Sequence, residues 1–138
     1  VHFEPNSRTL LAASARGLAI SSDNGETWRY ESDGLHGRYL RSVAVAGNTV
    51  LVTASTGPYT NQGALYHKEL GVTGSFTKCE EGLPKWFPSN IDTYCLSASG
   101  STAVLGTDGG EIYCSEDEGH TWTLITEALP SVHCVILS

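Results

Sequence analysis

The segment Ser21–Trp28 (SSDNGETW) recurs as Ser115–Trp122 (SEDEGHTW), and both copies read S-x-D-x-G-x-T-W. Between them, Glu69–Phe76 (ELGVTGSF) reads as a third copy that has lost the Asp and the Gly and ends in Ser-Phe instead of Thr-Trp. The final aromatic residues stand at positions 28, 76 and 122, at spacings of 48 and 46 residues. The chain therefore contains three copies of one unit.

A repeat of about 40–50 residues is typical of four-stranded sheets arranged around an axis, the architecture of a β-propeller. The sequence predicts an all-β fold with blades of four antiparallel strands and about three blades per chain, which is half of a six-bladed propeller. We divide the chain, as a single domain, into repeats of roughly 1–46, 47–99 and 100–138.

The repeated motif resembles the Asp-box, or bacterial neuraminidase repeat. That family occurs in sialidases, other glycoside hydrolases, sortilin-type receptors and photosystem II assembly factors. The opening pattern V-x-F-x-P-N-S-x-T-L-x-A is similar to that of the assembly factors. Together with the repeats, the resemblance covers nearly the whole chain. The resemblance implies a propeller with the motif on the side away from a ligand. It does not single out an activity, because one fold hosts many functions.

Each residue type in the motif suits a tight hairpin better than catalysis or metal binding. The aspartate accepts hydrogen bonds from backbone N–H groups just ahead, and the glycine supplies a positive φ. The threonine begins a strand, and the tryptophan packs back into the space between sheets. The structural positions are Ser21, Asp23, Gly25, Thr27, Trp28, Ser115, Asp117, Gly119, Thr121 and Trp122.

Alternating apolar residues bounded by turn signals predict the strands of each blade. Innermost strands are expected at Leu40–Ala46, Tyr94–Ser99 and Val132–Leu137. The other strands are expected at Thr9–Ser14, Gly17–Ser21, Thr27–Glu31, Thr49–Ala54, Ala64–His67, Ser75–Cys79, Thr102–Gly106, Glu111–Cys114 and Thr121–Ile125.

The two ends of the sequence stand at the same phase of the repeat. Val1–Asn6 reads as the tail of an innermost strand, and Val132–Ser138 reads as another. Closed propellers have at least about four blades, and uncovered strand edges invite pairing. We therefore expect two copies to associate as a homodimer that completes a six-bladed ring. The alternative is that the sequence belongs to a longer propeller.

Charge excludes two classes of partner. The net charge is −7 and the sequence pI is about 5.0. No stripe of Lys and Arg is present to neutralise phosphates, so nucleic acid and anionic membrane surfaces are not expected partners. No apolar run approaches the length of a membrane span.

The four cysteines, Cys79, Cys95, Cys114 and Cys134, form no C-x-x-C pair, so neither a metal site nor a cofactor is expected. We interpret them as buried reduced thiols. A bridge between Cys95 and Cys134 is the alternative. Unpaired cysteines favour a cytoplasmic location, although the sequence leaves the compartment open.

Ligands of propellers usually bind at the mouth of the central channel. The loops that enter the innermost strands and the loops between second and third strands build that mouth, and long loops often carry function. The binding candidates on these loops are Arg16, His36, Arg38, Tyr39, Tyr59, Trp86, Asp92 and His133. Each also has a structural interpretation, such as a wedge between blades for Trp86 or a turn for Asp92.

Two functions follow from this pattern. The first is a non-catalytic scaffold or binding module that recognises a protein or a carbohydrate at the channel mouth. The alternative is a glycoside hydrolase, either sialidase-like or using two carboxylates, for which Asp92 and Asp108 are the catalytic candidates. A sialidase needs an arginine triad, whereas this chain has five arginines and lacks the Phe-Arg-Ile-Pro signature, so the binding module is favoured.

Overall fold

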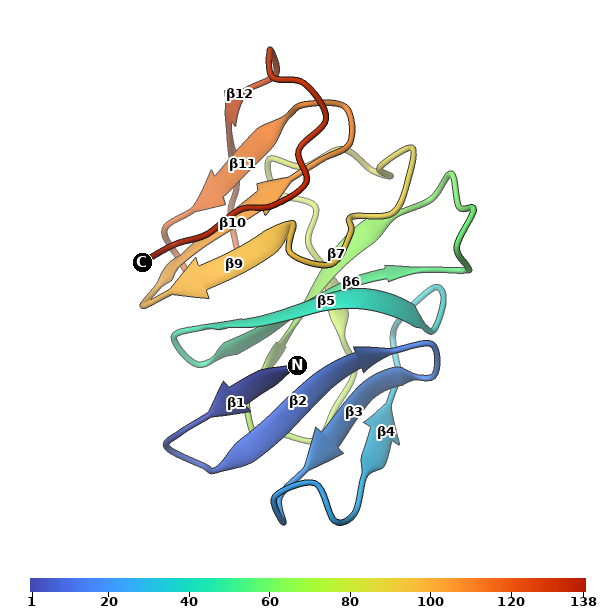
Figure 1. Ribbon diagram of the computed structural model, residues 1–138, viewed down its shortest axis with the longest axis vertical. Helices are drawn as coiled ribbons and strands as arrows, with labels where there is room; N and C mark the ends of the chain where they lie inside the picture. The colour runs from blue at the N-terminus through green and yellow to red at the C-terminus, as the bar shows by residue number, and fades with distance from the viewer.

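The computed structural model, which describes residues 1–138, contains twelve β-strands in three sheets and no helix (Figure 1). Blade 1 consists of β1 (His2–Glu4), β2 (Thr9–Ser14), β3 (Gly17–Ser21) and β4 (Arg29–Glu31). Blade 2 consists of β5 (Tyr39–Ala46), β6 (Thr49–Ser55), β7 (Ala64–Glu69) and β8 (Thr77–Lys78). Blade 3 consists of β9 (Leu96–Ser99), β10 (Thr102–Gly106), β11 (Ile112–Ser115) and β12 (Thr123–Thr126).

Each sheet is antiparallel, with its four strands in sequence order. The first strands of the sheets, β1, β5 and β9, lie next to one another (Figure 1). This arrangement is three consecutive blades of a β-propeller, as the repeat predicts. The model contains no helix that is long and apolar enough to cross a membrane.

The predicted strands are correct to within a few residues, and three of them (9–14, 17–21 and 102–106) have the predicted bounds. The outermost strands were predicted to begin at Thr27 and Thr121 but begin two residues later. The reason is local: the backbone N–H groups of both threonines donate to motif aspartates instead of to a neighbouring strand.

Two innermost elements differ from the prediction. β9 begins at Leu96, because Tyr94 adopts a positive φ of 73° that a strand does not accommodate. Val132–Leu137 is not a strand. Its two backbone bonds go to residues outside the strands, from the Val132 N–H to the Thr107 carbonyl at 3.0 Å and from the Val135 N–H to the Tyr94 carbonyl at 2.8 Å. Its prediction was wrong because an innermost strand is defined by an antiparallel second strand, and this segment has no such partner in the chain.

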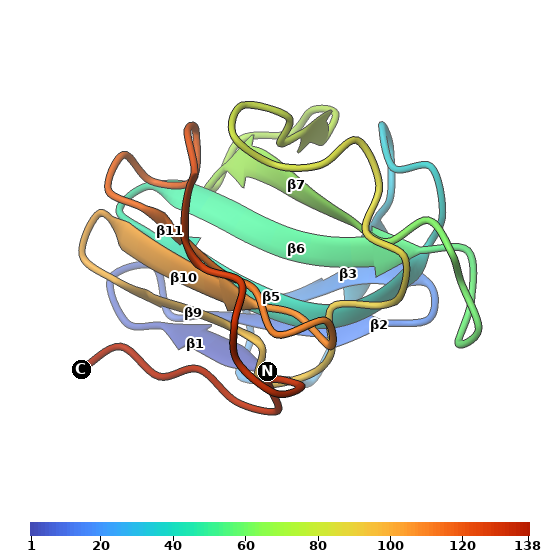
Figure 2. The same ribbon diagram turned by 90° about the horizontal axis from the view of Figure 1, so that it is seen from above.

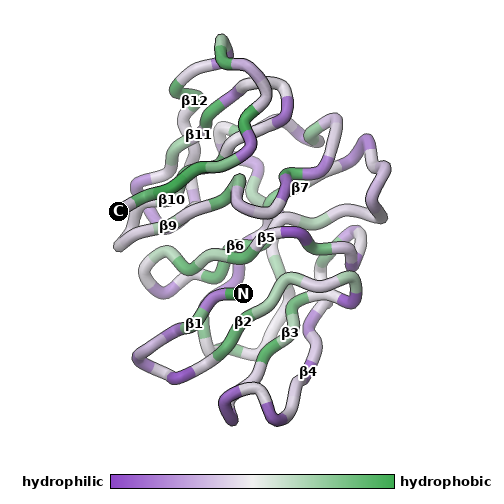
Figure 3. Tube along the Cα trace, in the orientation of Figure 1, coloured by the Kyte–Doolittle hydropathy of each residue, from purple (hydrophilic) through white to green (hydrophobic).

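Two apolar clusters join the blades. Leu11, Leu18 and Ile20 of blade 1 pack against Val50, Val52, Tyr66 and Phe76 of blade 2. A second cluster joins blades 2 and 3 and includes Leu51, Leu65, Phe87, Leu105 and Trp122. Figure 3 shows hydrophobic residues along the central strands β2, β3, β6 and β10, with hydrophilic residues at the turns. Blade 2 thus has two apolar faces, one toward blade 1 and one toward blade 3.

The connectors between blades repeat one backbone contact. The Phe76 N–H donates to the Asp33 carbonyl at 2.8 Å, and the Trp122 N–H donates to the Glu81 carbonyl at 3.0 Å. Gly34 and Gly82 follow these carbonyls with φ of 86° and 82°. A Cβ at either glycine would meet a backbone oxygen of the next blade within 2.2 Å, so only glycine allows this approach.

Candidate functional site

The two intact motif turns have the same internal hydrogen bonds. Asp23 accepts from the backbone N–H and the hydroxyl of Thr27 at 2.9 and 2.5 Å, and the Ser21 hydroxyl donates to Asp23 at 2.8 Å. The second copy repeats these bonds around Asp117 at 2.8, 2.6 and 2.8 Å. The predicted backbone bonds to both aspartates and the positive φ of both motif glycines are confirmed.

These hydrogen bonds hold both carboxylates in the ionised form. Donation from the Thr27 hydroxyl and backbone lowers the pKa of Asp23 from 3.8 to about 2, and Thr121 acts in the same way on the pKa of Asp117. A carboxylate that accepts bonds from its own turn is a poor proton donor near neutral pH. The motif is therefore a structural turn in this chain.

The motif tryptophans differ in burial. Trp122 is 5% exposed within the cluster between blades 2 and 3, as predicted, whereas Trp28 is 38% exposed. The prediction that Trp28 packs between sheets is wrong within residues 1–138, because none of the three blades in the structure covers this ring. In the middle copy, the strand register aligns Lys68, not Glu69, with Ser21 and Ser115, since its loop is one residue longer.

Three of the predicted residues meet in one cavity at the start of the innermost strands. Tyr59, Asp92 and Asp108 line this cavity of about 340 Å³. It lies where the long β6–β7 loop, which projects beyond the sheets in Figure 2, meets the connector that enters β9. We call it the mouth site. Its lining residues are Arg41, Pro58, Tyr59, Thr60, Ser89, Asn90, Asp92 and Asp108.

Arg41 was absent from the predicted site, and a β-bulge places it there. The β5–β6 register shifts between Leu40 and Ser42, so Arg41 has no partner in the ladder. Bulges re-aim side chains at functional positions. The Arg41 guanidinium stacks over the Tyr39 ring at 5.4 Å and donates to Asp92 at 2.7 Å. Its Nε atom is buried without a hydrogen-bond partner, so holding the side chain in this position is unfavourable to the stability of the fold.

The β6–β7 loop carries the aromatic residue of the site. Tyr59 lies near the loop tip and is fully exposed. The Asn90 amide fixes the loop base by donating to the carbonyls of Gly57 and Pro58, both at 3.1 Å. An ordered base therefore presents the Tyr59 ring beside Asp92. The unusual length of this loop was the only feature of the sequence that indicated Tyr59 as a residue of the site.

Backbone strain lies directly beside the mouth site. Tyr94, two residues after Asp92, adopts a positive φ, which is uncommon for a bulky residue, and its side chain is exposed. The backbone carbonyl of Asp92 begins this tight segment by accepting a hydrogen bond from the Cys95 N–H at 3.0 Å. Asp108 belongs to the β10–β11 turn and accepts a hydrogen bond from the Ser131 hydroxyl. Sequence reasoning missed Tyr94, because positive φ in a non-glycine residue leaves no compositional signal.

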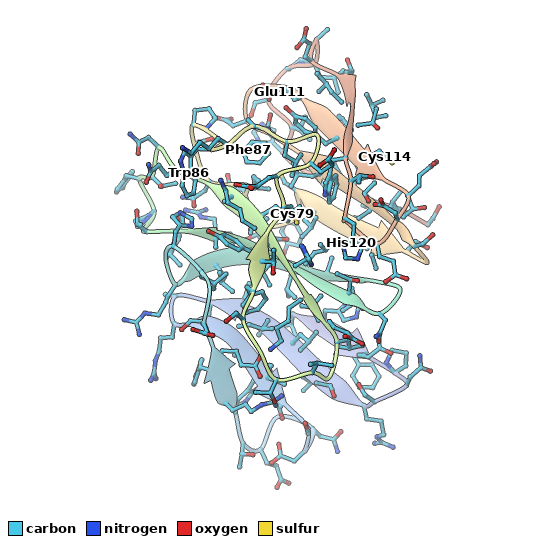
Figure 4. The ribbon with its side chains drawn as sticks, turned by 180° about the vertical axis from the view of Figure 1, so that it is seen from behind. Cys79, Trp86, Phe87, Glu111, Cys114 and His120 are labelled. Carbon is cyan, nitrogen blue, oxygen red and sulfur yellow. The ribbon has the colours of Figure 1, made fainter.

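The remaining candidates lie outside the mouth site. His36 and Trp86 form a separate cluster with ring centroids 4.6 Å apart, and His36 also bonds the Tyr66 hydroxyl at 2.8 Å. The Lys78 ammonium covers the Trp86 ring at 3.9 Å, so this indole is engaged within the chain. Figure 4 shows Trp86 next to Phe87 on the connector between blades 2 and 3.

Three charged candidates are scattered. The Arg16 guanidinium stacks over Tyr30 at 4.6 Å on blade 1. Arg38 contributes its carbonyl to the Gly17 N–H, and its side chain is exposed. His133 is exposed on the segment that follows blade 3. The structure therefore assembles no arginine triad.

A larger cavity, about 530 Å³, lies in the wedge between blades 1 and 2. Glu31 forms an ion pair with Lys68 across the junction and a second one with Arg29 of its own strand at 3.5 Å. Leu11, Leu18 and Ile20 line it and belong to the apolar cluster between the blades. We therefore assign this cavity to the packing of the junction rather than to recognition.

All four cysteines are free thiols. Cys79 and Cys95 are buried, as interpreted from the sequence, whereas Cys114 is half-buried and Cys134 is exposed. Burial raises the pKa of Cys79 to about 12. No group of three or more His, Cys, Asp or Glu side chains is arranged to hold a metal ion.

No protein-family model matches the chain, and the search of curated proteins finds no match to it.

Proposed function

We propose that this chain is a non-catalytic binding module of the Asp-box β-propeller type, and that it binds a carbohydrate at the mouth site. The geometry of the two S-x-D-x-G-x-T-W turns supports the family. The composition of the mouth site supports the ligand class: polar side chains and one fully exposed aromatic ring surround a cavity of about 340 Å³.

This composition suits a sugar. Carboxylates accept hydrogen bonds from hydroxyl groups, and an amide both donates and accepts them. Asp92, Asp108 and the side-chain carbonyl of Asn90 supply acceptors in the cavity lining, whereas the Asn90 N–H groups already donate to the Gly57 and Pro58 carbonyls. The apolar face of a sugar ring packs on an aromatic face, for which Tyr59 is placed. Charge-assisted bonds to fixed carboxylates then select ligands with hydroxyl groups.

The same geometry disfavours a glycoside hydrolase. A catalytic acid is typically held in an apolar, water-poor setting that keeps it protonated. The Asp92 side chain is 56% exposed and forms an ion pair with Arg41. Asp108 is exposed and bonded to Ser131. Neither carboxylate has the surroundings that such an acid requires.

The test is binding to a printed array of neutral and acidic oligosaccharides, followed by titration of the best binder. Tyr59→Ala, Asp92→Asn and Asp108→Asn should each weaken binding about ten-fold or more, the value of one charge-assisted bond or stacking contact. Glu116→Gln, which removes an exposed carboxylate from a motif turn, is the matched control and should bind like the wild type.

Two outcomes contradict the proposal. Turnover of aryl glycosides that disappears in Asp92→Asn or Asp108→Asn would establish a glycosidase. Binding to peptides but to no oligosaccharide, with loss in the Tyr59→Ala variant, would make the mouth site a protein-binding surface.

A further inference from the structure

The blades repeat not only in sequence but also in the faces they present to one another. Toward the following blade, blade 1 presents Leu11, Leu18 and Ile20, and blade 2 accepts them with Val50, Tyr66 and Phe76. The junction between blades 2 and 3 repeats this arrangement with Leu51 and Leu65 on one side and Leu105, Tyr113 and Trp122 on the other. The internal junctions thus define two complementary kinds of blade face.

Blade 1 leaves uncovered the face that would meet a preceding blade. The ladder aligns Phe3 with Leu10, Ala12 with Ala19, and Ala19 with Tyr30 on this face. Phe3 is 51% exposed and Tyr30 is 47% exposed. Trp28 stands beside them at the position of the buried Trp122. These positions are apolar or aromatic, and the one charged group against them is the Arg16 guanidinium, which stacks over the Tyr30 ring at 4.6 Å.

Blade 3 leaves uncovered the outer part of the face that would meet a following blade, whereas Val132 and Val135 of the C-terminal segment lie over Gly106 on its inner part. The ladder aligns Val104, Cys114 and Thr123 on this face, and Gly106 aligns with Ile112. A groove of about 490 Å³ crosses its outer part, lined by Cys114, Thr121, Thr123 and Ile125 and by the carboxylates Glu116 and Asp117 of the motif turn. Ile125 is 61% exposed. The ladder positions of this face are uncharged too, and depletion of charge is typical of the core of a protein interface.

The internal junction shows what fills such a groove. In blade 2, Cys79 follows the outer strand β8, and Trp122 of blade 3 packs against it in the same cluster. Ile125 holds the corresponding place in blade 3. Trp28 already has the ring placement of Trp122, because its indole N–H donates to the Gly25 carbonyl at 3.1 Å as Trp122 donates to Gly119 at 2.9 Å. The Trp28 ring therefore already has the orientation in which Trp122 packs against the neighbouring blade.

We propose that blade 1 of one chain packs against blade 3 of a second copy, with Trp28 seated in the groove beside Cys114, Thr123 and Ile125. Each chain presents both kinds of face, so two copies related by a two-fold axis satisfy both faces of both chains at once. The product is a closed ring of six blades with two mouth sites. The closure is self-limiting, because it leaves no blade face uncovered.

One connector departs from the internal pattern. Ala128 stands where Gly34 and Gly82 occur at the ends of blades 1 and 2. At those glycines a Cβ would lie within 2.2 Å of a backbone oxygen. The junction between copies therefore does not repeat the connector bond made by Asp33 and Glu81, and its apolar faces hold it together.

The first test is the solution mass by light scattering on a size-exclusion column. The expected mass is twice that of the 14.7 kDa chain. Tyr30→Lys and Ile125→Glu place a charge on one face each, and each variant should be a folded monomer by circular dichroism at micromolar concentration. Leu124→Glu is the matched control, because this partly exposed neighbour lies on the opposite face of β12, and it should remain a dimer.

Mixing the two monomeric variants tests which faces pair. The mixture contains one unaltered junction, between blade 3 of Tyr30→Lys and blade 1 of Ile125→Glu, and one junction with opposite charges. The mixture should therefore form a heterodimer although neither variant associates alone.

A folded wild-type monomer overturns the proposal, and so does a mass above two copies. A dimer that Ile125→Glu leaves intact means that two blade 1 faces pair instead. Loss of association should leave carbohydrate binding unchanged, because each mouth site is built from one chain. The failure of either proposal is thus distinguishable from the failure of the other.

Discussion

Trp28 and Trp122 occupy the same position of one motif and donate the same indole hydrogen bond, yet Trp28 is 38% exposed and Trp122 only 5%. The difference comes from outside the turn, since blade 2 covers Trp122 and no blade of the same chain covers Trp28. The local turn therefore fixes the ring orientation, and the neighbouring blade determines the burial.

Trp122→Ala and Trp28→Ala should differ in stability. Removing the buried Trp122 should cost about 3–5 kcal/mol of unfolding free energy, as truncation of a buried aromatic residue does. Removing Trp28 from a monomeric chain should cost about 1 kcal/mol, because less of its area is buried. Urea unfolding in the Ile125→Glu background measures both without a contribution from association. Equal losses would contradict the assignment of burial to the neighbouring blade.

The motif turns should weaken in acid. The pKa of Asp23 and of Asp117 is lowered to about 2 in the folded chain, mainly by the threonine hydroxyls. A folded pKa below the unfolded value of about 3.9 gives stabilisation that is complete above about pH 4 and is lost as pH falls through 2. In the Asp117→Asn variant, the midpoint temperature of unfolding should fall less between pH 4 and pH 2 than it does in the wild type. The control Glu116→Gln should keep the wild-type dependence of this midpoint on pH. If Asp117→Asn also keeps it, the Asp117 carboxylate is not the source of the acid sensitivity.

Gly82→Ala should disrupt the junction between blades 2 and 3. A Cβ there would lie 1.8 Å from the Trp122 carbonyl oxygen, and φ is 82°. The backbone strain alone costs about 1–3 kcal/mol, and the displaced connector adds to it. Gly74→Ala is the control, because nothing lies within 4 Å of its Cβ position and its φ is not positive. Chemical denaturation distinguishes the two variants, and equal stability would refute the close approach.

Ala128→Gly should strengthen association. A glycine lets the third connector adopt the conformation of Gly34 and Gly82 and add one backbone hydrogen bond per junction, worth about 1 kcal/mol. Because the dimer has two such junctions, its dissociation constant, measured by analytical ultracentrifugation, should fall about thirty-fold. Weaker association would show that the junction between copies uses a different connector path.

The thiols should react in the order of their exposure. Cys134 is exposed, whereas Cys79 is buried and its pKa is raised to about 12 by burial. Alkylation at pH 8 should therefore label Cys134 quickly and Cys79 only after unfolding, because the thiolate is the reacting form. Cys114 lies on the uncovered face of blade 3 and should become protected as the dimer forms. Mass spectrometry of timed digests gives each rate, and rapid labelling of Cys79 would contradict its burial.

The sequence predicted the blades well because their causes are local. Two-residue alternation, turn glycines and the S-x-D-x-G-x-T-W spacing act within a few residues, so Thr9–Ser14 and Thr102–Gly106 were predicted to the residue. The Asp23 and Asp117 hydrogen bonds were predictable for the same reason. Val132–Leu137 was predicted wrongly because its local pattern is that of a strand, whereas a strand also needs a partner.

The mouth site was predictable only in part. The length of the Thr56–Gly63 loop indicated Tyr59, and the connector position indicated Asp92, but their meeting with Asp108 depends on how blades 2 and 3 pack. Arg41 joins them through a bulge in β5, which alternation along the strand does not reveal. His36 and Trp86 lie on loops of the same class and yet form their own cluster.

By itself, the sequence determined the all-β class, the three repeats and the chemistry of each motif turn, because hydrogen bonds and φ preferences between near neighbours set these features. Only the tertiary structure decided which loop residues share a cavity and which apolar faces stay uncovered. Those outcomes depend on contacts between residues far apart in the chain, as Arg41 with Asp92 and Trp122 with Glu81 show. The packing of one blade against the next brings such residues together, and no local sequence pattern specifies which distant residues come into contact.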